Sequence, residues 1–224
     1  KPNKLVSTYI ICPGLKVKDD LVVRAYSIVS SPYDETLEFF SIVVPDGAFT
    51  SNLQHLQVGD ELYLEKIPYG FLTLARYQLP LPQDLWLLAT GTGLAPFISM
   101  LQDFATWENY QQIYLVYSVR TASELAYVKR IEEIASSFGE GHNGFKFVPI
   151  ITRDPHAQLH DRLPILIENG ELEAAVGQQL NAASSHVMLC GNPQMVDDTK
   201  EALKRRGLTM NRRGEGNIAV ENYW

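Results

Sequence analysis

The fold class follows most directly from Leu85-Trp86-Leu87-Leu88-Ala89-Thr90-Gly91-Thr92-Gly93. Its first five residues form a compact apolar run, which is typical of a strand that is buried on both faces of a parallel sheet. A glycine-rich turn follows the strand. The apolar residues behind this turn recur at helical spacing and predict an amphipathic helix: Leu94, Phe97, Ile98, Leu101 and Ala105. A strand, a glycine turn and a helix in this order are typical of an α/β unit.

The alternation of strand and helix continues towards the C-terminus. We expect strands at residues 113–117, 145–151 and 186–190, and helices at residues 123–138, 163–169 and 193–206. The last helix has the clearest boundaries, because Asn192 can cap it, Pro193 suits its first position, and Gly207 follows it. This alternation predicts a parallel sheet with helices on both faces.

Residues 1–79 have a different character, with short apolar or alternating runs between turn residues. We expect strands at residues 5–11, 21–29, 37–44 and 61–67, and turns at Pro13-Gly14, Ser31-Pro32 and Pro45-Asp46-Gly47. No long helical period occurs here. The sequence therefore predicts an all-β domain, a barrel or sandwich, at residues 1–79, followed by an α/β domain at residues 80–224.

Composition restricts the classes of function. Of the 224 residues, 46% are hydrophobic, which allows a full core, and the net charge of −7 argues against a general nucleic-acid binder. Cys12 and Cys190 are the only cysteines, so neither a disulfide framework nor a paired-cysteine metal site is expected. No apolar run reaches the roughly 18 residues of a membrane span, and the first residues do not resemble a signal peptide. We expect a cytoplasmic protein.

Ligands of open parallel sheets bind beyond the carboxyl ends of the strands. Residues 90–93, 118–120 and 191–194 lie at this edge, together with Thr152. A glycine turn that opens a helix lets backbone N–H groups approach a pyrophosphate. The spacing is not the full G-x-G-x-x-G pattern, so the turn alone is equally compatible with tight packing. We expect Thr152 and Asn192 to contact a bound nucleotide.

Arginines follow the strands at or just beyond this edge: Arg120, Arg153 and Arg162. An arginine fork can donate two parallel hydrogen bonds to a phosphate, such as the 2′-phosphate of a ribose. A single one of them would more simply be a solvated surface charge. Three at one edge favour NADP(H) over NAD(H).

In the β-rich part, Arg24-Ala25-Tyr26-Ser27 stands at the end of an expected strand. A tyrosine can stack on a flavin ring, a serine can hydrogen-bond near its reactive edge, and an arginine can hold a pyrophosphate. On composition alone these four residues would be ordinary strand residues.

Three segments, taken in order with the C-terminal Tyr223-Trp224, resemble the bacterial ferredoxin/flavodoxin–NADP reductases. They are Arg24-Ala25-Tyr26-Ser27, residues 88–96, and His186-Val187-Met188-Leu189-Cys190-Gly191-Asn192-Pro193-Gln194-Met195. The similarity extends from about Leu21 to the C-terminus. It implies an antiparallel FAD-binding β-barrel followed by a Rossmann-like parallel α/β NADP-binding domain, with flavin and nicotinamide meeting between them.

The resemblance also implies roles for single residues. Those expected to bind FAD are Arg24, Ala25, Tyr26, Ser27, Phe40, Ala48, Phe49 and Thr50. Thr92 would lie between the cofactors, and Arg120, Arg153 and Arg162 would hold the 2′-phosphate. Those expected to cover the flavin are Glu221, Asn222, Tyr223 and Trp224. The implied catalytic residues are Ser27 at the flavin, Cys190 against the nicotinamide, and Glu221 as a proton relay.

The implied activity is hydride transfer between NADPH and FAD, with single-electron exchange with a small carrier. Ferredoxin or flavodoxin is the expected partner of a monomeric enzyme. A reductase component of an oxygenase or of dihydroorotate dehydrogenase is the first alternative, although such proteins commonly need several cysteines for an iron–sulfur cluster. The second alternative is a redox-sensing module without turnover.

The densest basic cluster consists of Lys204, Arg205, Arg206, Arg212 and Arg213. It could steer an acidic carrier to the protein. The first three charges are equally explained by their place at a helix C-terminus.

One departure from the family concerns the region before Arg24. Only 23 residues precede it, and no Gly-Gln-Phe-type segment lies between Gly14 and Asp20. We therefore expect either a shortened barrel or a natural chain with additional residues.

Overall fold

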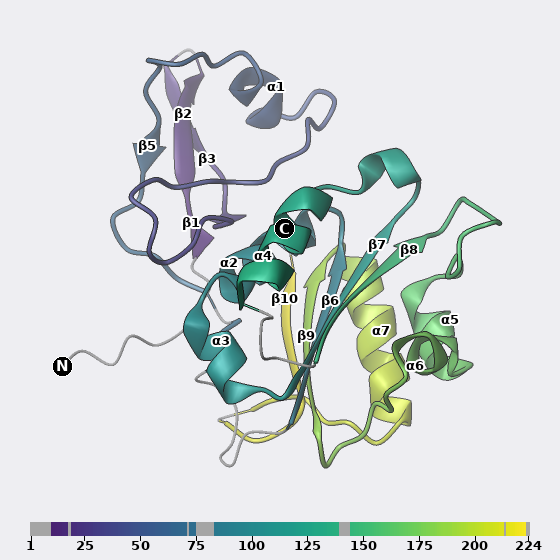
Figure 1. Cartoon of the computed structure of the whole chain (residues 1–224). Coiled ribbons are helices and arrows are strands. Elements are labelled where there is room, and N and C mark those ends of the chain that lie inside the picture. The colour runs from purple at the N-terminus through teal and green to yellow at the C-terminus, as the bar shows by residue number, and fades with distance from the viewer. Residues whose placement is uncertain are drawn as a thin grey trace.

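The structure is a computed structural model that describes residues 10–17, 19–70, 72–74, 83–138, 144–212 and 214–222. Its N-terminal part contains short antiparallel strands, and its C-terminal part is built on a parallel sheet flanked by helices (Figure 1). The predicted fold class is thereby confirmed. The expected boundary between residues 79 and 80 lies outside the described residues.

Five strands form the C-terminal sheet in the order β10-β9-β6-β7-β8, and all neighbouring pairs are parallel. Their bounds are Asp84–Thr90 (β6), Gln112–Val119 (β7), Phe145–Ile151 (β8), Ser185–Gly191 (β9) and Ile218–Asn222 (β10). Along β6, Leu87 packs in one apolar cluster and Leu88 in the other, on opposite faces of the sheet. Burial on both faces explains why the strand is a continuous apolar run.

Helices cover both faces of this sheet (Figure 1). On one face lie α2 (Ala95–Leu101), α3 (Phe104–Asn109) and α4 (Val128–Phe138). On the other lie α5 (Leu163–Glu168), α6 (Glu171–Val176) and α7 (Pro193–Arg205). The predicted helices 163–169 and 193–206 are confirmed to within one residue, whereas α6 and β10 were not predicted.

Two helices differ from the prediction: the one expected through Ala105 and the one expected at residues 123–138. The expected single helix through Ala105 is divided, because the Asp103 side chain accepts a hydrogen bond from Ala105 N (3.0 Å) and caps a new helix, α3. The helix expected from Ser123 begins only at Val128. Residues 122–124 form a 3₁₀ turn, and Tyr127 has φ of +60°, which interrupts a right-handed helix.

In the N-terminal part, β2 (Pro13–Val17) pairs with β3 (Asp20–Val23) and β5 (Tyr63–Leu64). β1 (Ile10–Ile11) pairs with β4 (Tyr26–Ser27). All of these pairs are antiparallel, and the short helix α1 (Thr50–Leu53) lies between β4 and β5 in the chain. Strands of two residues carry little periodic signal, so their bounds could not be read from the sequence.

Several expectations for this part were wrong in detail. Pro13-Gly14 is no turn but the start of β2, where a proline is tolerated as the first strand residue. The strand expected at residues 21–29 is interrupted at Arg24 and Ala25. Among the described residues, the strand expected at 37–44 is reduced to a single bridge between Ile28 and Phe39. Residues 5–9 lie outside the described part of the chain.

Apolar and polar contacts join the two parts of the molecule. Val29, Leu72 and Leu74 belong to the same buried cluster as α2. The side chain of Gln102 donates to the carbonyl of Val29 (2.9 Å), and Ser99 Oγ donates to the carbonyl of Ser30 (2.8 Å). These directed contacts fix how the β part sits on the parallel sheet.

Candidate active site

The strand order reverses between β6 and β9. After β6 the chain continues on one face of the sheet, and after β9 it continues on the opposite face. Ligands of open parallel sheets bind beyond the carboxyl ends of the strands at such a reversal. β6 leads into the 3₁₀ turn η2 (Gly91–Leu94), and β9 leads into α7. The predicted glycine turn therefore lies at the position of the sheet where a ligand is expected.

The ends of β6 and β9 approach so closely that two positions require glycine. A Cβ atom on Gly93 would lie 2.2 Å from the carbonyl oxygen of Cys190, and one on Gly191 would lie 2.2 Å from Thr90 Oγ1. Gly191 also has φ of +141°, which other residues rarely adopt. Close packing of the backbone thus explains these two glycines, while Gly91 stays exposed at the edge of the sheet.

The three expected catalytic residues come together at this edge. Ser27 Oγ, at the end of β4, donates a hydrogen bond of 2.8 Å to Glu221 Oε1 on β10. Glu221 lies beside Cys190 in the register of β10 and β9. All three residues are buried. The contact joins positions 194 residues apart, and it links the β part to the parallel sheet.

Tyr69 is a further group near this contact, and sequence reasoning missed it. Its hydroxyl lies 2.7 Å from the thiol of Cys12. That hydrogen bond, followed by burial and nearby negative charge that includes Glu221, raises the pKa of Tyr69 to about 12. The Tyr69 hydroxyl therefore stays protonated well above neutral pH and is engaged with Cys12.

Tyr26 packs within a small aromatic group in the β part. Its ring centroid lies 5.8 Å from that of Phe49 and 6.3 Å from that of Phe39. Burial raises the pKa of Tyr26, although a hydrogen bond with Ser41 and the charge of Arg24 act in the opposite direction. The ring is held from its sides and remains half-exposed, as a platform for a planar ligand requires.

The two residues that precede Tyr26 are accessible. Arg24 and Ala25 are exposed, and the hydrogen bond from Arg24 Nη1 to the carbonyl of Val23 (2.8 Å) uses only part of the guanidinium. As far as the described residues show, the other donors of this side chain remain available to a phosphate.

Phe40 lies at the contact between the two parts rather than on an open surface. Its ring meets that of Tyr127 edge-on, with centroids 5.3 Å apart. Tyr127 Oη donates to Glu38 Oε1 (2.7 Å), so both the ring and the hydroxyl of Tyr127 reach across from the α/β part. The predicted place of Phe40 beside a flavin remains a prediction.

Ala48, Phe49 and Thr50 lead into α1. Ala48 is exposed, whereas Phe49 and Thr50 are buried. Thr50 Oγ1 accepts a hydrogen bond from Val44 N (2.9 Å), which holds the preceding loop against the helix. Their role as FAD ligands remains a prediction.

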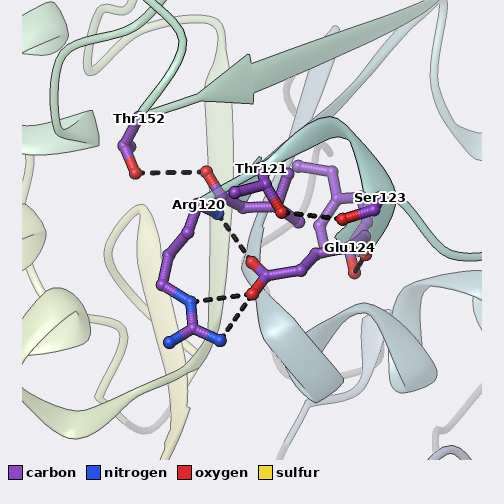
Figure 2. Close-up of polar contacts among 7 residues, drawn as sticks. Arg120, Thr121, Ser123, Glu124 and Thr152 are labelled. Atoms are coloured by element: carbon purple, nitrogen blue, oxygen red, sulfur yellow. Dashed lines mark hydrogen bonds and ion pairs between the residues drawn. The ribbon is translucent and has the colours of Figure 1, made fainter.

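Arg120 lies directly beyond β7, and Figure 2 shows its surroundings. Its Nε donates to Glu124 Oε1 (2.8 Å), as does Nη2, and its backbone N–H donates to Glu124 Oε2 (2.8 Å). The hydrogen bond from Arg120 is the largest cause that lowers the pKa of Glu124. The Arg120 side chain nevertheless remains 65% exposed. Glu124 had no place in the sequence prediction.

The end of β8 lies beside the end of β7. Thr152 Oγ1 donates to the carbonyl of Val119 (3.2 Å; Figure 2), and Arg153 N donates to the carbonyl of Arg120 (2.9 Å). The backbones of Arg120 and Arg153 are therefore adjacent. Arg162 is exposed as the residue that precedes α5. All three arginines lie on the loops that leave this edge, as the sequence predicted.

Asn192 has a structural task that the sequence also predicted. Its side-chain oxygen accepts from the backbone N–H groups of Gln194 (3.0 Å) and Met195 (3.3 Å), and so caps α7. Thr92 is half-buried in η2, and Asn222 is exposed where β10 pairs with Gly191. Their contact with a nucleotide remains a prediction. Tyr223 and Trp224, expected over the flavin, lie outside the described residues.

The basic cluster at the end of α7 is engaged within the protein. Lys204 pairs with Glu201 (2.8 Å), Arg206 with Glu173 (2.7 Å), and Arg205 with Glu168. Because α7 leaves the carboxyl edge and the chain then returns to the start of β10, the cluster lies at the other edge of the sheet. These pairs account for the first three charges of the cluster. Docking of an acidic carrier through Arg212, which is exposed, remains a prediction, and Arg213 lies outside the described residues.

In the part of the chain that the structure describes, no group of three or more His, Cys, Asp or Glu residues is placed to hold a metal ion. Nor does any helix in those ranges combine the length and the apolar character that crossing a bilayer requires.

Comparison with known proteins agrees with this geometry. Residues 87–201 match the oxidoreductase NAD-binding domain family. Over 214 residues the chain is 39% identical to the flavodoxin/ferredoxin–NADP reductase of Escherichia coli (strain K12), which covers 94% of this chain and 84% of the relative. It is 41% identical over 215 residues to the ferredoxin–NADP reductase of Pseudomonas aeruginosa, with 93% and 82% covered. The chain belongs to the ferredoxin/flavodoxin–NADP reductase family.

A solved structure of the same family has the same fold. The ferredoxin NADP⁺ reductase from Neisseria gonorrhoeae, crystallised with bound FAD and NADP, superimposes with a TM-score of 0.87 at 34% identity. The match covers 96% of this chain and 86% of that chain. The family resemblance that the sequence motifs indicated is therefore confirmed.

Proposed function

We propose that this protein is an FAD-dependent ferredoxin/flavodoxin–NADP⁺ reductase, which transfers hydride between NADPH and FAD and single electrons to or from a small carrier. The observation that carries the proposal is the buried bond between Ser27 and Glu221. It brings the end of the flavin motif to the carboxyl edge of the parallel sheet, next to the reversal in strand order. Two cofactors bound to the two parts would meet there.

The residues of the β part fit FAD, and residues 1–79 form the flavin domain in this proposal. The exposed Arg24 supports a pyrophosphate contact, because a guanidinium has five donors and only one of them is used by Val23. Tyr26 offers a half-exposed ring that Phe39 and Phe49 hold in place. Ala48, Phe49 and Thr50 complete the phosphate end of the site.

Residues 80–224 form the NADP(H) domain. The turn at Thr92 provides a backbone that a pyrophosphate can approach, with Thr152 and Asn192 on the neighbouring loops. Arg120, Arg153 and Arg162 bind the 2′-phosphate, which their position on adjacent loops and their exposure support.

Bound FAD supplies the conversion between two-electron hydride transfer and one-electron steps. The protein's task is to hold the reacting atoms at roughly 3–3.5 Å. Ser27 presents its hydroxyl at the junction, oriented by Glu221. Cys190 is buried next to Glu221 and forms a small, polarizable wall for the nicotinamide. Glu221 carries protons between solvent and the junction.

The end of the chain completes the flavin site in this proposal. Asn222 ends β10 at the same edge as Gly191. Tyr223 and Trp224 stack over the flavin and yield to the nicotinamide. Ferredoxin or flavodoxin is the electron carrier, and the enzyme works as a monomer in the cytoplasm.

An absorbance spectrum of the purified protein, followed by anaerobic titration, tests the proposal. We expect a flavin spectrum at about one FAD per chain, bleached by NADPH and far less by NADH at the same concentration. A protein that stays colourless after incubation with FAD contradicts the proposal. Bleaching without electron transfer to added ferredoxin or flavodoxin would instead favour the sensing module or a dedicated oxygenase partner.

A further inference from the structure

The turn after β7 contains a closed ring of hydrogen bonds between Arg120 and Glu124 (Figure 2). One carboxylate oxygen of Glu124 accepts from Nε and Nη2 of the guanidinium. The other accepts from the backbone N–H of the same arginine (2.8 Å). Because the carboxylate holds both ends of Arg120, it restricts the rotamers of a side chain that is otherwise exposed and flexible.

The turn that carries Glu124 is itself well supported. Glu124 N donates to the carbonyl of Thr121 (3.0 Å), and Tyr117 Oη donates to the carbonyl of Glu124 (3.4 Å). The hydroxyls of Thr121 and Ser123 lie 3.0 Å apart on the same turn. Glu124 is thus a fixed anchor for Arg120 rather than a second mobile group.

The contact leaves the outer edge of the guanidinium open. Glu124 takes the edge formed by Nε and Nη2, and within the described ranges no bond engages Nη1. The edge formed by Nη1 and Nη2 can still make two parallel hydrogen bonds to a phosphate. The acidic partner and a phosphate therefore use different edges of the same side chain.

We propose that Glu124 is the positioning residue that preorganises Arg120 for the 2′-phosphate of NADP(H), and so sets part of the preference over NAD(H). This inference rests on the proposed function. Ordering a flexible side chain on binding weakens affinity by roughly two- to twelve-fold. A carboxylate that has already ordered Arg120 removes this cost from the binding step.

Charge repulsion between Glu124 and the phosphate acts in the opposite direction. Both of its oxygens are engaged by Arg120, and at about 0.15 M salt charges are screened over about 8 Å. When Glu124 is removed, loss of positioning should weaken the binding of the 2′-phosphate, whereas loss of repulsion should strengthen it. Affinity measured at low and at physiological salt therefore distinguishes them.

The test compares binding of 2′-phospho-AMP and 5′-AMP by the FAD-loaded protein, with Glu124→Ala and Glu124→Gln as variants. We expect Glu124→Ala to weaken the binding of 2′-phospho-AMP about three- to ten-fold and to leave the binding of 5′-AMP unchanged. Glu124→Gln keeps one acceptor and should lose less affinity for 2′-phospho-AMP. The KM for NADPH should rise by a similar factor, with kcat and the KM for NADH unchanged. Glu133, an exposed carboxylate on α4, provides the matched control variants Glu133→Ala and Glu133→Gln.

Unchanged or tighter binding of 2′-phospho-AMP by both Glu124 variants overturns the positioning role. If Glu124→Ala does not retain FAD, Glu124→Gln alone decides the outcome. A wild-type protein that binds 2′-phospho-AMP no more tightly than 5′-AMP overturns the proposed NADP(H) function as well, and this result is seen before any variant is made.

Discussion

Gly93 illustrates how one atom can determine the geometry of the site. Its missing Cβ leaves room for the carbonyl of Cys190, on the strand beside it. The neighbouring Gly91 differs, because its φ is +52° but a Cβ there would meet nothing within 4 Å. One glycine is required by packing and the other by conformation, within a turn of four residues.

This difference gives a paired prediction. We expect Gly93→Ala to lower the free energy of unfolding by about 1–3 kcal/mol and to weaken NADPH binding, because β9 must move away from β6. Gly91→Ala should lower the free energy of unfolding by only about 1–2 kcal/mol, because the new side chain would strain a left-handed backbone. Urea unfolding and NADPH titration of both variants provide the measurement. Equal effects on NADPH affinity would contradict the packing argument.

Which single residues could be anticipated from the sequence depends on whether their signal is local. The cap at Asn192 and the arginines behind the strands follow from their position relative to neighbouring elements. The partnership of Ser27 with Glu221 was suggested only by family resemblance, since nothing within either segment specifies the other. Tyr69 was missed for the same reason, because its thiol partner Cys12 lies 57 residues away. Glu124 is only four residues from Arg120, but the segment was expected to be helical from Ser123, and the turn that brings the two side chains together was not predicted.

The end of α2 contacts the β part through one buried side chain. Gln102 follows this helix and is buried, with its amide nitrogen donating to the carbonyls of Val29 (2.9 Å) and Ile98 (3.1 Å). Its amide oxygen accepts from Nε and Nη2 of Arg130 on α4 (3.1 and 2.6 Å). One side chain thus ties two helices to the strand region that leads away from Ser27.

Replacement of this amide tests the junction. We expect Gln102→Leu to destabilise the protein by about 1–3 kcal/mol or more, because it leaves the Val29 carbonyl and the Arg130 guanidinium without their buried partner. Retention of FAD should fall as well, since the orientation of the β part depends on this contact. Chemical denaturation followed by flavin release measures both effects. Wild-type stability in this variant would show that apolar packing alone joins the two parts.

The elements of the parallel sheet were more predictable than those of the β part. β6 and β9 are buried on both faces and therefore read as long apolar runs, which a sequence pattern detects directly. β1, β4 and β5 have two residues each, and their partners lie far away in sequence. The break at Asp103 was missed because apolar spacing continues across it, while the deciding interaction is a side-chain cap.

At the scale of the whole molecule, the buried pair of His186 and Tyr110 predicts how the free energy of unfolding depends on pH. His186 on β9 is fully buried, and its Nδ1 lies 2.8 Å from the hydroxyl of Tyr110. Burial lowers the pKa of His186 from 6.5 to about 3 and raises that of Tyr110. The imidazole is therefore neutral in the native protein, so the phenol can donate to it.

The sign of the effect follows from proton uptake. Between pH 6.5 and about 3 the unfolded chain binds a proton at this histidine that the native protein does not bind. The contribution of His186 is thus complete above pH 6.5 and is lost as the pH falls towards 3. In His186→Gln, we expect the difference in unfolding free energy from wild type to be constant above neutrality and to shrink in acid. A difference that does not vary with pH would contradict a neutral, buried His186.

The account depends on the two parts of the chain building one reaction site at the end of β6 and β9. Rapid anaerobic mixing of the FAD-loaded protein with NADPH tests this most directly, because a long-wavelength charge-transfer band forms only when the flavin and nicotinamide rings stack. We predict that this band precedes flavin bleaching with NADPH. A protein that binds FAD and NADPH together, yet shows neither the band nor flavin reduction, would contradict the account.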